Sequence, residues 1–282
     1  MSTVSFKAFK LHETSVPVGV VTRFATIGES ASGSVFVSLL YTKATIASRQ
    51  LAHKLKIIIL LCSLALVLPF LCLTAEGKDF TVVIDPGHGG HDPGAIGRRG
   101  KEKNINLNVA LKVGRLIQNN CKDVKVIFTR RSDVFIPLDR RAQIANNAKA
   151  DLFISIHTNS VARGRNVRGT ETYTLGLHRT EENLEVAKKE NSVILIEDNY
   201  QQRYAGFNPN SSESYIIFEF LQDKNMEKSV KLATLIQKQF KTSARRIDKG
   251  VHQAGFLVLR ETSMPGVLVE LGYISTPDEE QY

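Results

Sequence analysis

From Phe80 onwards, short apolar runs alternate with stretches in which apolar residues recur every three or four positions. Short runs rich in β-branched residues predict strands, and the longer periodicity predicts helices. Six strands are expected: FTVVID (80–85), VKVIFT (124–129), LFISIH (152–157), TETYTL (170–175), FLVLR (256–260) and VLVEL (267–271). Three helices are expected at 105–116, 138–148 and 226–240. Alternating strands and helices predict a single-domain α/β fold, with a mostly parallel twisted sheet flanked by helices.

The N-terminal part of the chain has a different pattern. A short basic flank at Lys54 and Lys56 precedes a continuous apolar run that ends in small residues. This pattern predicts a secretory signal peptide over 54–75, although the run is also long enough to act as an N-terminal membrane anchor. In both cases 76–282 is exported. Residues 1–53 precede this signal, so we expect either a misplaced translation start or a genuine Ser-rich leader.

Composition and charge exclude several classes of protein. Hydrophobic residues make up 43% of the chain and charged residues 23%, which is typical of a globular protein. The net charge of +9 suits an anionic polymer, but no basic run is interleaved with aromatic residues, so nucleic-acid binding is not expected. Cys62 and Cys72 lie in the apolar N-terminal run, so Cys121 is left alone as a partly buried thiol. A disulfide framework and a cysteine metal site are therefore not expected.

Two histidines end predicted buried strands. His88 follows the first strand within a glycine-rich loop, and His157 closes the third strand. Open α/β sheets bind ligands at the carboxyl ends of their strands, and imidazole is the commonest protein ligand of zinc. Either histidine alone could be a turn residue or a structural core residue. Two of them at one sheet edge indicate a metal site.

Two carboxylates extend this set. Glu102 begins a predicted helix, where acidic residues are common, but the loop from His88 leads directly to it. Two histidines and one carboxylate with an open fourth position are typical of catalytic zinc. Glu270 lies inside an apolar strand, where an unpaired carboxylate is costly, and beside a metal it could exchange protons with water. Asp85 is a candidate for orienting a histidine.

The motifs that contain these residues occur in a characteristic order: DPGHGG (85–90), GKEK (100–103), SIHTN (155–159) and VLVELGYIS (267–275). Over about 80–275 the chain closely resembles the zinc-dependent N-acetylmuramoyl-L-alanine amidase family (the Amidase_3 catalytic domain). The resemblance implies that His88, Glu102 and His157 bind one Zn²⁺ and that Glu270 is the catalytic acid/base.

The same resemblance implies a function in the cell wall. Its reaction is hydrolysis of the amide between N-acetylmuramic acid and L-alanine in peptidoglycan, usually for daughter-cell separation, in the periplasm or at the wall. The family normally continues into a final helix, so 76–282 is expected to be an amidase catalytic domain that lacks it. Two alternatives stay open: another zinc hydrolase of the wall that cuts within the stem peptide, and a catalytically silent wall-binding domain. Retention of all four polar positions argues against the silent domain.

A long insertion separates the strand ending near Leu175 from the helix starting near Met226. Such insertions in compact domains are usually functional or mobile. Residues 183–198 have a helical pattern, and 204–212 are rich in turn residues and expected to be flexible. Septal amidases resemble this layout, with a helix that covers the zinc until an activator protein moves it. Glu190 is the first candidate for the blocking carboxylate and Glu197 the second; alternatively, this is a surface helix with solvated glutamates.

Overall fold

The computed structural model describes residues 53–60, 79–162, 166–219 and 224–282. The chain divides into two units, Met1–Glu76 and Gly77–Tyr282. In the first unit, residues 53–60 form a helix, while the predictions for 1–52 and 61–75 lie outside the described residues. Within the described ranges, no helix combines the length and the apolar character needed to cross a membrane.

The second unit contains a six-stranded sheet in the order β2-β1-β3-β6-β4-β5. Its strands are β1 (Phe80–Pro86), β2 (Val124–Phe128), β3 (Leu152–Asn159), β4 (Thr170–Leu175), β5 (Asp248–Ala254) and β6 (Gly266–Tyr273). The first four strands in this order are parallel, whereas β4 runs antiparallel to β6 and parallel to β5. The sheet edge at which β1, β3 and β6 end is therefore also the edge at which β4 and β5 begin.

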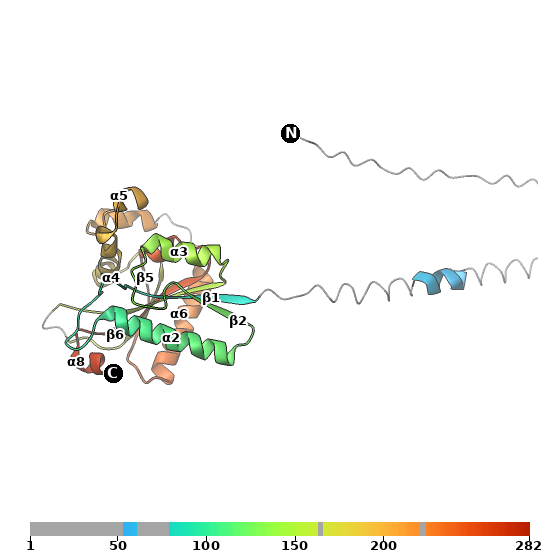
Figure 1. The fold of residues 1–282 in the computed structure, drawn as a ribbon, viewed down its shortest axis with the longest axis horizontal. Coiled ribbons are helices and arrows are strands. Elements are labelled where there is room, and N and C mark those ends of the chain that lie inside the picture. The colour runs from blue at the N-terminus through green and yellow to red at the C-terminus, as the bar shows by residue number, and fades with distance from the viewer. Residues whose placement is uncertain (1–52, 61–78, 163–165, 220–223) are drawn as a thin grey trace, which may run out of the picture. The chain divides into compact units, whose positions relative to one another are not determined.

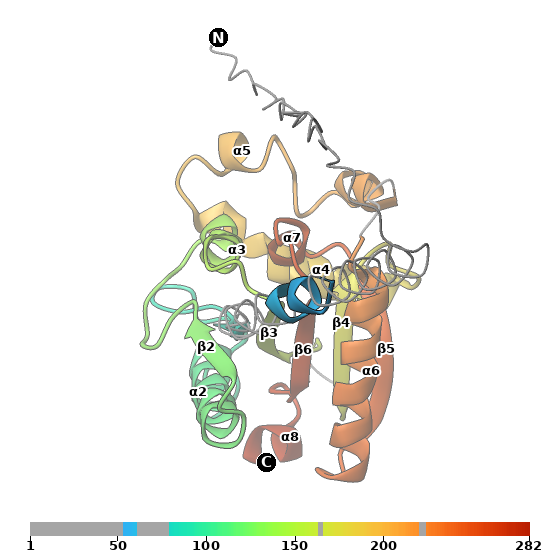
Figure 2. The same ribbon diagram turned by 90° about the vertical axis from the view of Figure 1, so that its right-hand side faces the viewer.

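Helices cover both faces of this sheet, which confirms the predicted α/β fold (Figure 1). On one face α2 (Glu102–Asn120) packs against β1, β2 and β3, and α6 (Met226–Thr242) packs against β4, β5 and β6. The other face is covered by α3 (Leu138–Asn147), α4 (Glu181–Asn191) and α7 (Leu257–Arg260), which share one apolar core with Tyr173 and Leu268. Figure 2 shows β6 between β3 and β4, near the middle of the sheet.

Two local predictions are wrong, and one strand was not predicted. The run at 256–260 was expected to be a strand, but Leu257–Arg260 form the short helix α7, with Leu257, Val258 and Leu259 buried. Its apolar character fits a buried helical turn as well as a strand, because a short apolar run has no distinguishing period. The strand β5 was missed because its sequence, DKGVHQA, is polar and half-exposed at the sheet edge. Cys121, expected to be partly buried, is exposed just after α2.

The insertion is a packed structure made of α4, η1 (Ser192–Ile196), α5 (Tyr200–Arg203) and η2 (Ser212–Glu219). The helix predicted over 183–198 is regular up to Asn191 and then tightens into a 3₁₀ turn. Tyr204 and Phe207, expected in a flexible segment, are 2% and 7% exposed and belong to the main core. Asn191 fixes the end of α4, since its amide donates to the Gly255 carbonyl (2.7 Å) and accepts from the Leu257 N–H (2.9 Å).

Candidate metal centre

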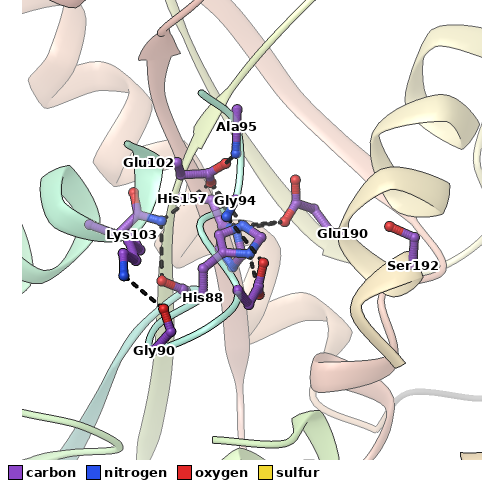
Figure 3. Close-up of polar contacts among 12 residues, drawn as sticks. His88, Gly90, Gly94, Ala95, Glu102, Lys103, His157, Glu190 and Ser192 are labelled. Atoms are coloured by element: carbon purple, nitrogen blue, oxygen red, sulfur yellow. Dashed lines mark hydrogen bonds and ion pairs between the residues drawn. The ribbon is translucent and has the colours of Figure 1, made fainter. Parts of the chain in front are cut away.

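The predicted ligands converge at the carboxyl ends of β1 and β3 (Figure 3). His88 follows β1, His157 lies in the neighbouring strand β3, and Glu102 is the first residue of α2. Glu190, from the last turn of α4, completes a group of four buried side chains. One ligand atom from each of them lies within 4.8 Å of all the others.

The geometry of this group fits a zinc ion. His88 Nε2 lies 3.1 Å from Glu102 Oε1 and 3.1 Å from Glu190 Oε2. His157 Nδ1 lies 3.3 Å and 2.8 Å from the same two oxygens. Nevertheless, within the described part of the chain neither nitrogen has a properly oriented hydrogen-bond partner, although buried polar atoms usually do. Two imidazole nitrogens and two carboxylates directed at a common centre are a donor set that zinc prefers.

The glycine-rich loop allows the two histidines to approach each other. A Cβ atom at Gly87 would lie 2.3 Å from the His157 ring, so a larger residue cannot occupy this position without displacing that ring. His88 itself has a φ of 60°, a left-handed conformation that is uncommon for residues other than glycine. The rings of His88 and His157 lie edge to face with their centroids 5.0 Å apart.

Two buried arginines hold this strained loop in place. Arg141 donates to the carbonyls of Pro86 (2.8 Å) and His88 (2.9 Å), and Arg130 donates to the carbonyl of Gly87 (2.8 Å). Asp85 accepts from Arg141 at 2.8 Å and contacts neither histidine, so its predicted role in orienting a histidine is wrong. Burial opposes ionisation of Asp85, but Arg141 and the hydroxyls of Thr129 and Ser155 outweigh it and lower the pKa of this carboxyl.

Asp92 is the residue that orients His88, and sequence reasoning missed it. Its Oδ2 lies 2.7 Å from His88 Nδ1, and its Oδ1 accepts from the Gly94 N–H at 3.1 Å. A carboxylate on Nδ1 selects the tautomer whose Nε2 is free to bind a metal. The spacing of four residues between His88 and Asp92 within one loop was the available signal.

Glu102 is held by backbone donors. Its Oε2 accepts from the Ala95 N–H (2.8 Å) and its Oε1 accepts from the Thr158 N–H (3.0 Å), next to His157. Burial opposes its ionisation, yet the charges of His88 and Lys189 hold the pKa of Glu102 well below its usual range. For His157, burial lowers the pKa, but Glu190 and Glu102 outweigh burial and raise it to about 9.

Glu270 lies in β6 directly opposite His157 of β3 and is 1% exposed. In the described part of the chain, neither of its carboxylate oxygens has a hydrogen-bond partner. Burial, and then the charge of Glu190, raise the pKa of Glu270 well above its usual range, and Lys189 offsets this only in part. A buried, unpaired carboxyl group beside a group of candidate metal ligands is suited to accepting and returning a proton.

The two candidate blocking residues have different environments. Glu190 is 4% exposed and faces both histidines, so it is not a solvated residue of a surface helix. Glu197 lies away from the cluster, where it accepts from the Leu138 N–H (3.0 Å) and the Tyr204 hydroxyl (2.8 Å). The second candidate is therefore wrong, because Glu197 provides the N-terminal cap of α3 instead.

Known proteins resemble this chain over the same region. The profile of the Amidase_3 family, described as N-acetylmuramoyl-L-alanine amidase, matches residues 82–282. The chain is 33% identical to N-acetylmuramoyl-L-alanine amidase AmiA of Escherichia coli (strain K12) over 210 residues, which are 73% of this chain and 70% of that protein. It is 33% identical to a putative N-acetylmuramoyl-L-alanine amidase of Buchnera aphidicola subsp. Acyrthosiphon pisum (strain APS), covering 70% of this chain and 83% of that one.

A solved structure has the same fold. The N-acetylmuramoyl-L-alanine amidase from Clostridium difficile 630 superposes with a TM-score of 0.54 at 29% identity, over 73% of this chain and 86% of that one.

Proposed function

Because the chain belongs to the N-acetylmuramoyl-L-alanine amidase family, we propose that it is a zinc enzyme that separates stem peptides from the glycan of peptidoglycan. Peptidoglycan amidase activity follows from this membership. The zinc ion, the roles of individual residues and the cellular location of the reaction belong to the proposal. The bond cleaved would be the amide between the lactyl group of N-acetylmuramic acid and L-alanine.

The observation that carries the proposal is the convergence of His88 Nε2, His157 Nδ1 and a Glu102 oxygen on one buried centre. These three residues would hold the zinc ion, and Asp92 would fix the tautomer of His88. A zinc ion held there supplies Lewis-acid activation of the attacking water and of the amide carbonyl. The backbone donors on Glu102 keep its carboxylate oriented towards the centre, so the set is preorganised.

Glu270 would transfer the proton. It takes one proton from the water as the new C–O bond forms and gives it to the alanine nitrogen as the C–N bond breaks. The burial of Glu270, which raises the pKa of its carboxyl group, supports this role, since that group must hold a proton between the two steps. Its location opposite His157 supports it as well, because the proton then has only a short path to follow.

Glu190 would inhibit this centre in the state described here. Its carboxylate occupies the fourth position of the donor set, which an attacking water needs. Activity would then require displacement of α4, and an activator protein acting on 183–198 is the expected agent. Such control suits an enzyme of daughter-cell separation, because an unrestrained wall hydrolase would lyse its cell. The predicted signal at 54–75 supports a location in the periplasm or at the wall.

Digestion of purified peptidoglycan tests the reaction. The full chain loaded with zinc should release intact stem peptides and leave a free lactyl carboxyl group, both identified by mass spectrometry. An excess of chelator should abolish release, and added zinc should restore it. Cleavage within the stem would instead indicate a peptidase. No cleavage by the zinc-loaded protein, including the Glu190→Ala variant, would indicate a silent wall-binding domain.

A further inference from the structure

One cavity adjoins the histidine–glutamate cluster, and a second, much larger one lies beside Lys189, whose Nζ is 3.2 Å from Glu190 and 3.7 Å from Glu102. The one bounded by His88, Glu190 and Leu138 has a volume of about 10 Å³, which is roughly the space of one water molecule. The other is bounded by Lys189, Asn159 and Tyr273 and has a volume of about 690 Å³. Ligand pockets usually measure about 300–1,000 Å³, so the second cavity can hold a piece of substrate.

The wall of the large cavity contains a connected set of polar side chains from three strands. Glu171 of β4 accepts from the hydroxyls of Tyr173 and Tyr273, each at 2.6 Å. Lys249 of β5 lies with its Nζ 3.1 Å from Glu171 Oε1 and 5.8 Å from the centroid of the Tyr273 ring. Glu171 is 5% exposed, Tyr173 1% and Tyr273 4%, so this set is built into the sheet rather than attached to its surface.

This set lies next to the reacting groups. Glu171 pairs with Glu270 across β4 and β6, and Tyr273 follows Glu270 by three residues. A substrate whose amide lies at the histidine–glutamate cluster would therefore extend past Glu270 into this cavity. Strand residues hold such contacts more rigidly than loop residues would.

The ammonium group of Lys249 can donate further hydrogen bonds. An ammonium group has three donors, and the contacts of Lys249 here are one carboxylate and one ring face. Its side chain is 31% exposed, so the remaining donors are accessible from the cavity. The opposite wall belongs to α4 and contributes three carboxylates (Glu181, Glu182 and Glu185) against one ammonium group (Lys189), so its net charge disfavours an anionic ligand while α4 stays in place. Removal of α4 would thus open the metal and make the cavity more attractive to an anion in the same event.

We propose that this cavity is the subsite for the stem peptide and that Lys249 binds a carboxylate of that peptide. The inference rests on the proposed amidase function. Stem peptides carry free carboxylates beyond L-alanine, and an ammonium group fixed by Glu171 can bind one of them without moving. Lys249 is thus a specificity-determining residue that acts on substrate binding, whereas the chemistry stays with the metal ligands and Glu270.

A matched pair of soluble N-acetylmuramoyl tripeptides tests this subsite. The two differ only in whether the residue after L-alanine carries a free carboxylate or a primary amide. The zinc-loaded full chain should show a KM about tenfold lower for the carboxylate form, with little change in kcat, as expected for one charge-assisted hydrogen bond. Lys249→Gln should remove this difference and Lys249→Arg should retain it. Lys238→Gln, on the exposed side of α6, is the control for the change in net charge.

The measurements are repeated in a Glu190→Ala background, so that a blocked site cannot hide the effect. Equal KM values for the two substrates in the Glu190→Ala background would overturn the subsite while leaving the amidase function intact. An undiminished preference in Lys249→Gln would also overturn it. If neither substrate is cut in either background, the proposed function itself fails. The substrate preference measured in the Glu190→Ala background decides whether the subsite exists even if Lys249→Gln does not fold.

Discussion

Replacement of Glu190 by alanine should activate the enzyme. The Glu190 carboxylate lies 3.1 Å from His88 Nε2 and 2.8 Å from His157 Nδ1, and it fills the fourth position of the donor set. Alanine cannot occupy that position. The substitution also removes the negative charge that pairs with Lys189 at 3.2 Å, so the closed state loses its attraction to Lys189 as well as its attraction to the two histidines.

The size of the effect follows from the contacts that hold the closed state. Glu190 holds the closed state through buried ion pairs with His88, His157 and Lys189, and part of their attraction is offset by the cost of burying the carboxylate. We therefore expect a net loss of about 1.4–2.8 kcal/mol from the closed state, which corresponds to a rise of roughly 10–100-fold in basal turnover. Deletion of 183–222 should raise turnover at least as much if the rest of the domain stays folded.

The assay is release of stem peptides from purified peptidoglycan by zinc-loaded protein without any activator. Glu227→Ala on α6 is the matched control, because it removes one exposed carboxylate on the opposite face of the sheet. Elemental analysis should find one zinc ion per chain in every variant, and circular dichroism should confirm folding. Unchanged basal turnover in Glu190→Ala and in the deletion, with zinc bound and folding intact, would refute the inhibitory role.

Three further predictions concern the centre and its support. Glu270→Ala should keep its zinc but lose about 10²–10⁴-fold in turnover, and loss of zinc instead would make Glu270 a ligand. Asp92→Ala should weaken zinc binding by about 10–100-fold in a competition titration with a chelator, and unchanged affinity would contradict its role on His88. Asp85→Asn should cost about 3–5 kcal/mol of unfolding free energy at pH 7, because Arg141 is left buried without its partner. Folding lowers the pKa of Asp85, so the stability that its carboxylate contributes is complete above the unfolded pKa near 3.8 and is lost as the pH falls through the folded pKa. The unfolding free energy of Asp85→Asn should therefore fall less steeply on acidification than that of the unaltered protein. An equally steep fall would contradict this.

The parts of the fold that were predictable have strong local patterns. The runs that became β1 and β3 are apolar because both faces of a parallel sheet are covered, and His88 and His157 stand out at their ends. By contrast, β5 is a polar edge strand and α7 is a buried helical turn, so neither has a pattern that identifies it. Local sequence decides such elements less than the packing around them does.

The supporting residues of the centre were harder to predict than its ligands. Arg141 lies 53 positions from His88 along the chain, and nothing in its own helix marks it as the donor to the His88 carbonyl. Glu190 follows two lysines and Glu197 follows an aliphatic run, but neither context indicates that one caps α3 and the other faces the histidines. Which of the two glutamates faces the histidines depends on the path of the whole insertion, and that path is known only from the tertiary structure.

The attachment of Asn191 would determine how the proposed block by Glu190 is released. Glu190 directly precedes this residue, so the proposed inhibitory carboxylate lies beside the pivot of α4, whereas the N-terminal end near Glu181 is about 14 Å away at 1.5 Å per residue. A force on the N-terminal end that tilts α4 about Asn191 would hardly move Glu190, because Glu190 lies next to the pivot. Release therefore requires that the last helical turn unwinds or that the hydrogen bonds of Asn191 break. Partial engagement by an activator would then achieve little, and wall cleavage would begin abruptly once engagement is complete.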